Sequence, residues 1–407
     1  MTKNIQINLS KLHPAQRQIA DSPVRFKVVC CGRRFGKTYL AIDDVVNTLL
    51  DGKLYGYFAP TYADLEKLAW KPLKKILEPI TSYKHETYKI IETITGGVFT
   101  GFTLQDERAG QGHKFHKVTI DEAASVPKLR TIFEESIRPT LLDYVGDATL
   151  YSTPRGHNDF WNFYNQGIDP LKPDWQAFHF TSYDNPHMDT LELEQIKAST
   201  PLRTWQQEYL AQFTADGGQV FRGVDKIAVL PPVEPYEGEF VFGVDWGRVN
   251  DFTAISVVDI NTQEQVCIER FNQIGWQAQR NRLMTLYLKW KPFRILAEEN
   301  SIGEVNIEAL AQQAWNEGHE DFIIDGFQTT AVSKPSLIDD LTTAIERGHI
   351  KLQDDANQTN EFTAYALQRL PSGRFRFSAP SGGHDDTVIA TALSWRATTE
   401  SGIHIGE

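Results

Sequence analysis

Short apolar runs alternate with amphipathic stretches through residues 1–215, and each run has the length of a buried strand. This order is typical of an α/β domain whose helices cover a mostly parallel sheet. The runs predict strands at 26–31, 54–59, 116–120 and 147–152. After the first strand, apolar residues recur at helical spacing and predict a helix, at Leu40, Ala41, Val45 and Leu49.

The second half shows a different order of elements. Paired glycines at 217–218 and a proline cluster at 231–235 predict a linker over 216–239. Three closely spaced apolar runs then predict an antiparallel meander, and alternating strands and helices follow, with strands at 240–245, 253–260, 265–271, 294–298 and 321–325. A last helix is expected to begin near Asp385. Three antiparallel strands followed by such alternation indicate a ribonuclease-H-like sheet, so we predict domains at 1–215 and 240–407.

Composition agrees with two soluble domains. The chain has 407 residues, which is long for one core, with 41% hydrophobic and 23% charged residues. No window approaches the ~20 apolar residues of a membrane span, and the polar start does not have the pattern of a signal peptide. Three cysteines fit no disulfide or zinc pattern and indicate a reducing compartment. The net charge of −12 argues against a passive nucleic-acid coat, so any phosphate-binding surface must be local.

The first strand runs into Gly32-Arg33-Arg34-Phe35-Gly36-Lys37-Thr38, which has the pattern of a phosphate-binding loop. Such loops work because backbone N–H groups and a helix N-terminus converge on an anion. We expect Lys37 to reach the β- and γ-phosphates and the Thr38 hydroxyl to hold Mg²⁺. The usual first glycine position is occupied by Cys31, and Gly32 comes one residue late.

A second motif fits the same nucleotide site. Residues 118–123 read as a strand that ends in Asp121 and Glu122. We expect Asp121 to bind Mg²⁺ through water and Glu122 to polarise the water that attacks the γ-phosphate. Either acid alone would be an ordinary helix start, but after a phosphate-binding loop the pair indicates ATP hydrolysis.

Carboxylates in the second half fall where a two-metal nuclease needs them. Hydrolysis of a phosphodiester by two cations requires acids that hold the ions ~3.5–4 Å apart. Asp245 ends a strand between two glycines, and Glu298 ends another. Asp385 and Asp386 open the last helix, where acids are favoured in any case. We predict a metal site from Asp245, Glu298 and one of these two aspartates, and the sequence does not decide which.

These motifs resemble the large terminase subunits of tailed double-stranded DNA bacteriophages, over nearly the whole chain. An arginine inside the loop is typical of that family, and the resemblance implies that Arg33, or alternatively Arg34, contacts the γ-phosphate or couples hydrolysis to movement. It also implies that Gln16 reads the adenine and that 152–156 senses the nucleotide state. Arg108 is implied to reach a neighbouring subunit's nucleotide, with Arg138 a weaker alternative.

The resemblance implies a motor-nuclease for genome packaging. Its first domain would have a RecA-like ATPase fold, use ATP with Mg²⁺ and drive duplex DNA through the portal. Its second domain would cut concatemeric DNA with two divalent ions, Mg²⁺ or Mn²⁺. The implied partners are double-stranded DNA, the portal protein, a small terminase subunit and further copies in a pentameric ring. The implied location is the bacterial host cytoplasm, at the procapsid and not in the mature virion.

Three other functions are compatible with parts of the sequence. A repair or recombination helicase-nuclease would need a second RecA-like domain, and the space between residues 160 and 240 is too small. A binding subunit that only bridges portal and DNA would not need Lys37, Glu122 and Asp245. A small-molecule kinase would leave the C-terminal acids without a role.

Overall fold

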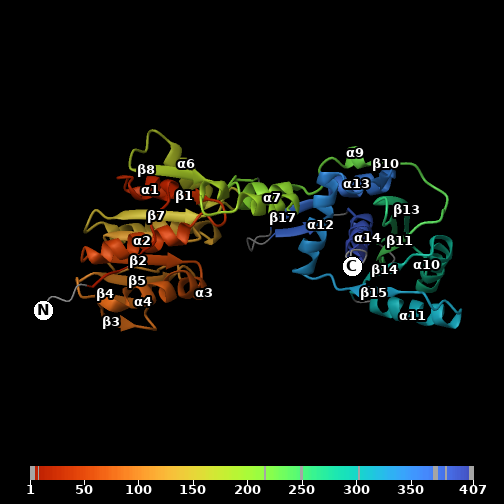
Figure 1. Cartoon of the computed structure of the whole chain (residues 1–407), viewed down its shortest axis with the longest axis horizontal. Helices are drawn as coiled ribbons and strands as arrows, with labels where there is room; N and C mark the ends of the chain where they lie inside the picture. Colours follow the sequence, from red (N-terminus) through yellow and green to blue (C-terminus); the bar gives the residue numbers. More distant parts are fainter. Residues whose placement is uncertain are drawn as a thin grey trace. The chain divides into compact units, whose positions relative to one another are not determined.

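The computed structural model describes residues 5–7, 9–214, 217–247, 251–300, 303–369, 375–380 and 383–402. The chain divides into two compact units, Met1–Gln195 with Arg203–Asp216 and Ile196–Leu202 with Gly217–Glu407 (Figure 1). No described helix is both long enough and apolar enough to cross a lipid bilayer.

The first unit is built on one sheet of eight strands in the order β3-β4-β5-β2-β6-β7-β1-β8. Six strands from β5 to β8 in this order are parallel, and β3 and β4 extend the sheet as an antiparallel edge. The strands are β1 (Phe26–Cys31), β2 (Leu54–Ala59), β3 (Thr81–His85), β4 (Ile90–Thr93), β5 (Val98–Thr103), β6 (Lys117–Ile120), β7 (Asp147–Ser152) and β8 (Trp175–Phe180).

Helices cover both faces of this sheet because its central strands are apolar on both sides. Val29 and Cys31 of β1 pack with the helices after the first two strands, and Val28 and Cys30 pack on the opposite face. The α-helices are α1 (Pro14–Ala20), α2 (Lys37–Leu50), α3 (Tyr62–Asp64), α4 (Lys71–Leu77), α5 (Leu129–Ile132), α6 (Asp159–Ile168), α7 (Thr190–Ala198) and α8 (Leu202–Glu208). The π- and 3₁₀-helices are η1 (Leu65–Trp70), η2 (Glu78–Ile80), η3 (Ala123–Ser125), η4 (Phe133–Ile137), η5 (Arg138–Leu141) and η6 (Ser182–Asp184).

The second unit has a five-stranded sheet in the order β13-β12-β11-β14-β15. Its first three strands form an antiparallel meander, and β14 and β15 run parallel to β11. The strands are β9 (Gly217–Gln219), β10 (Ala228–Leu230), β11 (Phe240–Asp245), β12 (Thr253–Asp259), β13 (Glu264–Phe271), β14 (Arg294–Glu298), β15 (Ile324–Phe327), β16 (Leu352–Gln353), β17 (Ala366–Arg369) and β18 (Phe375–Ser378). The helices are α9 (Val224–Ile227), α10 (Trp276–Trp290), α11 (Gly303–Asn316), α12 (Ser333–Arg347), α13 (Ala356–Ala364) and α14 (Asp386–Gly402).

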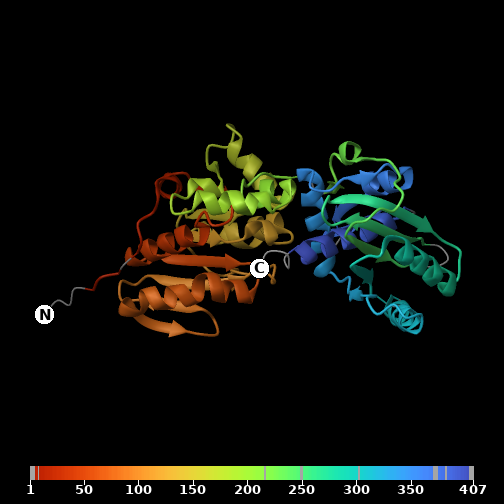
Figure 2. The same ribbon diagram turned by 45° about the vertical axis from the view of Figure 1, so that its right-hand side comes forward.

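The two sheets confirm the predicted fold class. The parallel-rich first sheet and the three-plus-two order of the second are those expected from the sequence (Figure 2). One predicted strand was displaced, since the strand expected at 321–325 is β15 at Ile324–Phe327.

The segment predicted as a linker, 216–239, contains ordered elements of the second unit. Its strand β9 pairs with β17, and β10 pairs with β16, so both partners lie more than 100 residues further along the chain. Phe221 within it is fully buried and packs against Phe362 and Tyr365. The glycines and prolines therefore lie between short strands that pack on the second core.

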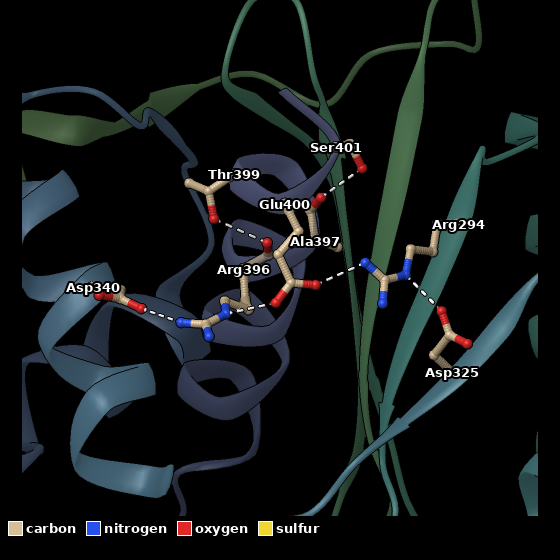
Figure 3. Close-up of polar contacts among 8 residues, drawn as sticks. All are labelled: Arg294, Asp325, Asp340, Arg396, Ala397, Thr399, Glu400 and Ser401. Carbon is tan, nitrogen blue, oxygen red and sulfur yellow. Dashed lines mark hydrogen bonds and ion pairs between the residues drawn. The ribbon is translucent and has the colours of Figure 1, made fainter. Parts of the chain in front are cut away.

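Helix α14 is fixed to the second sheet along its length. Near its middle it lies so close to β11 that a Cβ atom on Gly243 would stand 2.0 Å from the Ala390 carbonyl oxygen. Towards its end, Figure 3 shows a chain of ion pairs in which Glu400 bridges two arginines. Arg294 Nη1 lies 2.7 Å from one Glu400 oxygen and Arg396 Nε lies 2.8 Å from the other. These contacts hold the beginning of α14, which carries Asp386, in a fixed register with the sheet.

Candidate nucleotide and metal sites

The loop between β1 and α2 is held open by backbone contacts that only glycine permits. A Cβ atom on Gly32 would lie 2.3 Å from the Tyr209 carbonyl oxygen, and Gly36 has a φ of 97°, in the left-handed region. The Arg33 amide donates to the Glu208 carbonyl at 2.7 Å, and the Ser182 hydroxyl donates to the Arg33 carbonyl at 2.7 Å. The loop is thus shaped by residues 182–209, far away in sequence.

Lys37 is buried at the bottom of this loop. Its ammonium group donates to the carbonyls of Cys31 and Gly32 at 3.0 and 3.2 Å and to the Thr153 hydroxyl at 2.9 Å. Thr153 belongs to the segment expected to sense the nucleotide state, and its hydroxyl also donates to the Cys31 carbonyl. The position of Lys37 is therefore linked directly to that segment.

Asp121 and Glu122 follow β6 at the same end of the sheet. Asp121 accepts from the Thr38 hydroxyl at 3.1 Å and from the Tyr57 hydroxyl at 2.6 Å. Burial raises the pKa of Asp121 above its ordinary value, although these hydrogen bonds and Lys37 oppose the shift. Burial also raises the pKa of Glu122, again opposed by Lys37. Glu122 adopts φ 50°, ψ 39°, a strained backbone conformation of the kind that recurs at functional sites.

Lys37, Thr38 and Glu122 line one cavity of about 610 Å³, and the fully buried Asp121 reaches it only through its hydrogen bond with Thr38. Both loop arginines line it, and the Arg33 guanidinium is ion-paired with Glu208 at 2.6 Å. The cavity lining includes Arg33, Arg34, Gly36, Lys37, Thr38 and Glu122. The arrangement provides a cationic, glycine-lined cradle next to two carboxylates, which suits a triphosphate and Mg²⁺.

Two residues assigned by resemblance do not line this cavity. The Gln16 amide is engaged by backbone on both sides, since it accepts from the His13 amide at 3.1 Å and donates to the Gly36 carbonyl at 3.1 Å. Arg108 lies on an exposed loop, with 80% of its side chain accessible, and its nearest acid is Asp106 at 3.7 Å. Arg138, the alternative, is ion-paired with Glu134.

In the second unit, Asp245 and Glu298 meet at the carboxyl ends of β11 and β14. The pairing of β11 with β14 brings these two strand ends side by side. Burial raises the pKa of Asp245 well above its ordinary value, and repulsion from Glu298, Asp386 and Asp385 raises it further. Asn300 donates to Glu298 at 3.2 Å and to the Thr329 carbonyl at 2.8 Å, so it orients that carboxylate.

The two aspartates at the start of α14 point to different partners. Asp385 is ion-paired with Lys334 at 3.2 Å. Asp386 lies 3.9 Å from Arg270, and burial together with repulsion from Glu361 and Asp385 raises the pKa of Asp386 to about 7. No three acidic, histidine or cysteine side chains of the described residues stand close enough to hold a metal ion together. Asp245 and Glu298 are nevertheless close enough for Glu298 to raise the pKa of Asp245, and Asp385 and Asp386 act in the same direction.

The comparisons with known proteins point to one family. A family profile described as "Terminase large subunit, T4likevirus-type, N-terminal" matches residues 29–225. A large terminase subunit of Thermus virus P23-45 is 27% identical over 95% of this chain and 87% of its own length. The chain is similar to terminase large subunits over nearly its whole length. A large terminase subunit of Escherichia phage T5 is also 27% identical, over 63% of this chain and 61% of its own length.

A solved structure supports the fold of the whole chain. The large terminase of a thermophilic bacteriophage covers 95% of this chain and 99% of its own, with a TM-score of 0.53 and 16% sequence identity. The matches confirm the resemblance to large terminase subunits drawn from the motifs.

The acids at the ends of β11 and β14 fit divalent cations. Carboxylate oxygens are the ligands that Mg²⁺ and Mn²⁺ prefer. Two acids whose repulsion raises the pKa of Asp245 would be stabilised as carboxylates by a bound cation. Asp245 and Glu298 are the residues that would hold such an ion, and Asp385 or Asp386 would join them by leaving its present partner.

Several site residues could not be found from motifs. Glu361 pairs with Arg270 at 2.9 Å and accepts from the Thr387 amide at 2.8 Å, so it caps the start of α14. The Arg270 guanidinium lies 3.4 Å from the centre of the Phe252 ring. Tyr365 is fully buried, lies close enough to Asp385 and Asp245 for both to raise its pKa, and its hydroxyl has no partner among the described residues. In the sequence these residues are isolated polar or aromatic positions.

Proposed function

We propose that this chain is the motor and the nuclease of a phage DNA-packaging machine. The first unit hydrolyses ATP to move double-stranded DNA through the portal into the procapsid. The second unit cuts concatemeric DNA with divalent ions. The observation that carries this proposal is the presence of both sites in one chain that is similar to terminase large subunits, each at the carboxyl ends of its own central strands.

We assign each step of ATP hydrolysis to groups around the first cavity. The loop amides and Lys37 would bind the β- and γ-phosphates, and Thr38 and Asp121 would hold Mg²⁺. Glu122 orients the attacking water, because its carboxylate faces the same cavity and its pKa stays under the influence of Lys37. Arg33 exchanges Glu208 for the γ-phosphate as charge develops there.

DNA cleavage rests on the second unit's own acids. Bound divalent ions supply a nucleophilic hydroxide and neutralise the leaving oxygen. Asp245 and Glu298 hold these ions as carboxylates, with Asn300 fixing the orientation of Glu298. Lys334, beside Asp385, is placed to bind the DNA phosphate next to the cut.

The assembly proposed for packaging is a ring of copies on the portal, supplied with DNA by a small terminase subunit. The exposed Arg108 supports this, because a side chain 80% accessible and outside its own cavity can enter the nucleotide site of a neighbouring copy. The ring would act in the host cytoplasm during packaging.

Paired substitutions test the two activities separately in the full chain. Glu122→Gln is expected to lower ATP turnover by more than about 100-fold and to leave plasmid cleavage in Mn²⁺ unchanged. Glu298→Gln is expected to abolish cleavage and leave ATP turnover unchanged. Glu299→Gln is the matched control, because it removes the neighbouring charge and should retain both activities. Cleavage by Glu298→Gln at the unaltered rate would reject the nuclease assignment, and full ATP turnover by Glu122→Gln would reject the motor.

A further inference from the structure

A groove of about 560 Å³ lies on the edge of the first unit, away from both sites described above. Helix α4 forms one side and the β3 edge strand forms the other. We call it the lysine groove, because four of its nine lining residues are lysines: Lys71, Lys74, Lys75, Glu78, Thr81, Ser82, Tyr83, Lys84 and Ile91. This local concentration of positive charge stands out in a chain whose net charge is −12.

The acids around the groove do not neutralise it. Lys74 is paired with Glu86 at 2.6 Å, which leaves Glu78 as the only acid among the groove's lining residues. Lys71 and Lys75 make no ion pair and no side-chain hydrogen bond within the described part of the chain, and both are exposed. Three lysines therefore face solvent with one opposing carboxylate.

The repulsion between these lysines does not stabilise the fold. Lys71 and Lys75 are four residues apart on a helix, a spacing at which like charges destabilise by a few tenths of a kcal/mol. Lys67, in the π-helix η1 that leads into α4, lines the nucleotide cavity. The continuous segment η1–α4 thus lines both the nucleotide cavity and the groove, and Lys84 lines the groove from β3.

We propose that the lysine groove binds the phosphate backbone of duplex DNA during translocation. Ammonium groups and exposed hydroxyls are the donors that contact phosphates without reading bases, and Ser82 and Tyr83 supply exposed hydroxyls beside the lysines. Contacts of this kind suit a motor that must grip any sequence. Lys67, which lines the ATP cavity, and the groove lysines Lys71 and Lys75 lie on one continuous helical segment. A movement of that segment on ATP hydrolysis would therefore also move the lysines that bind the DNA.

The inference rests on the proposed function. The experiment distinguishes a failure of the groove assignment from a failure of that function. Binding of a fluorescein-labelled duplex to the full chain is followed by anisotropy over a range of NaCl concentrations, in EDTA so that nothing is cut. The triple variant Lys71→Gln, Lys75→Gln, Lys84→Gln should bind more weakly, with a plot of log affinity against log salt less steep by about 2.7, or 0.9 for each lost phosphate contact.

The control removes three exposed lysines from other parts of the same unit, as Lys11→Gln, Lys128→Gln, Lys172→Gln, and should keep the unaltered slope. Both variants should keep the unaltered thermal unfolding midpoint, because the side chains are exposed. An unaltered slope in the groove variant, or an equal loss in the control, would overturn the groove assignment and leave the proposed function standing. Failure of the unaltered chain to bind duplex DNA would count against the proposed function itself.

Discussion

Gly243→Ala should separate the two activities by moving one helix. The added Cβ atom would stand 2.0 Å from the Ala390 carbonyl oxygen and 2.3 Å from the Ser394 amide nitrogen, both of which are backbone atoms of α14. Ordinary contact begins at 3.4 Å, so the helix would have to retreat by about 1.4 Å. The ion pairs through Glu400 hold its far end to the sheet and resist that movement.

The size of the effect follows from this displacement. Overpacking a core typically destabilises by about 1–3 kcal/mol, and a clash with backbone on a pinned helix belongs at the upper end. Asp245 lies two residues beyond the substitution and Asp386 begins the displaced helix. Because a misplacement of about 1 Å can slow a reaction about 100-fold, we expect cleavage in Mn²⁺ to fall by about that factor. ATP turnover should not change.

The assay combines plasmid cleavage with hydrogen exchange of peptides from β11 and α14. A loss of about 3 kcal/mol should speed their exchange by about 100-fold, since 1.4 kcal/mol corresponds to a factor of ten. Gly275→Ala is the control, because no heavy atom lies within 4 Å of the Cβ position there. Native exchange and native cleavage in Gly243→Ala would refute the described packing of α14 on β11.

Three further predictions follow from individual contacts. Tyr365→Phe should leave the free energy of unfolding unchanged or raise it by up to about 1 kcal/mol, measured in urea, because it removes a buried hydroxyl that has no partner among the described residues. Glu400→Gln should lower the free energy of unfolding by about 0.5–1 kcal/mol near neutral pH. Hydrogen bonds from its two arginines lower the pKa of Glu400 below 4.5. The difference in stability should therefore disappear as the pH falls through that lowered pKa. Mixing Arg108→Ala with Glu122→Gln chains should restore ATP turnover on assembled rings if Arg108 acts on a neighbouring copy, and no gain over the separate chains would exclude that role.

Much of the fold could be predicted because its central strands are buried on both faces. Runs such as 26–31 and 240–245 are mostly apolar, and the structure places strands there with the same bounds. The edge strand β3 could not be found this way, since its residues Thr81–His85 are mostly polar and exposed. The assignment of 216–239 as a linker failed because β9 and β10 are defined by partners more than 100 residues away.

The site residues, like the strands, fall into those that a local sequence pattern marks and those that it does not. Lys37, Glu122, Asp245 and Glu298 stand in local motifs next to strand ends, so sequence spacing alone singles them out as candidates, and their roles stay predictions. Groups that orient them come from distant segments and carry no motif. Glu208 fixes Arg33 from 175 residues away, and pairings of that range are determined only by the folded chain.

The most direct test of the central claim is a titration of Mn²⁺ into the full chain, with the free ion followed by electron paramagnetic resonance in the absence of nucleotide. We predict that Asp245→Asn weakens Mn²⁺ binding by more than about 10-fold, because it removes a ligand from the buried acid pair, while Glu299→Gln binds as the unaltered chain does. Equal Mn²⁺ affinity in Asp245→Asn and the unaltered chain would contradict the claim that these acids form the metal site of a nuclease.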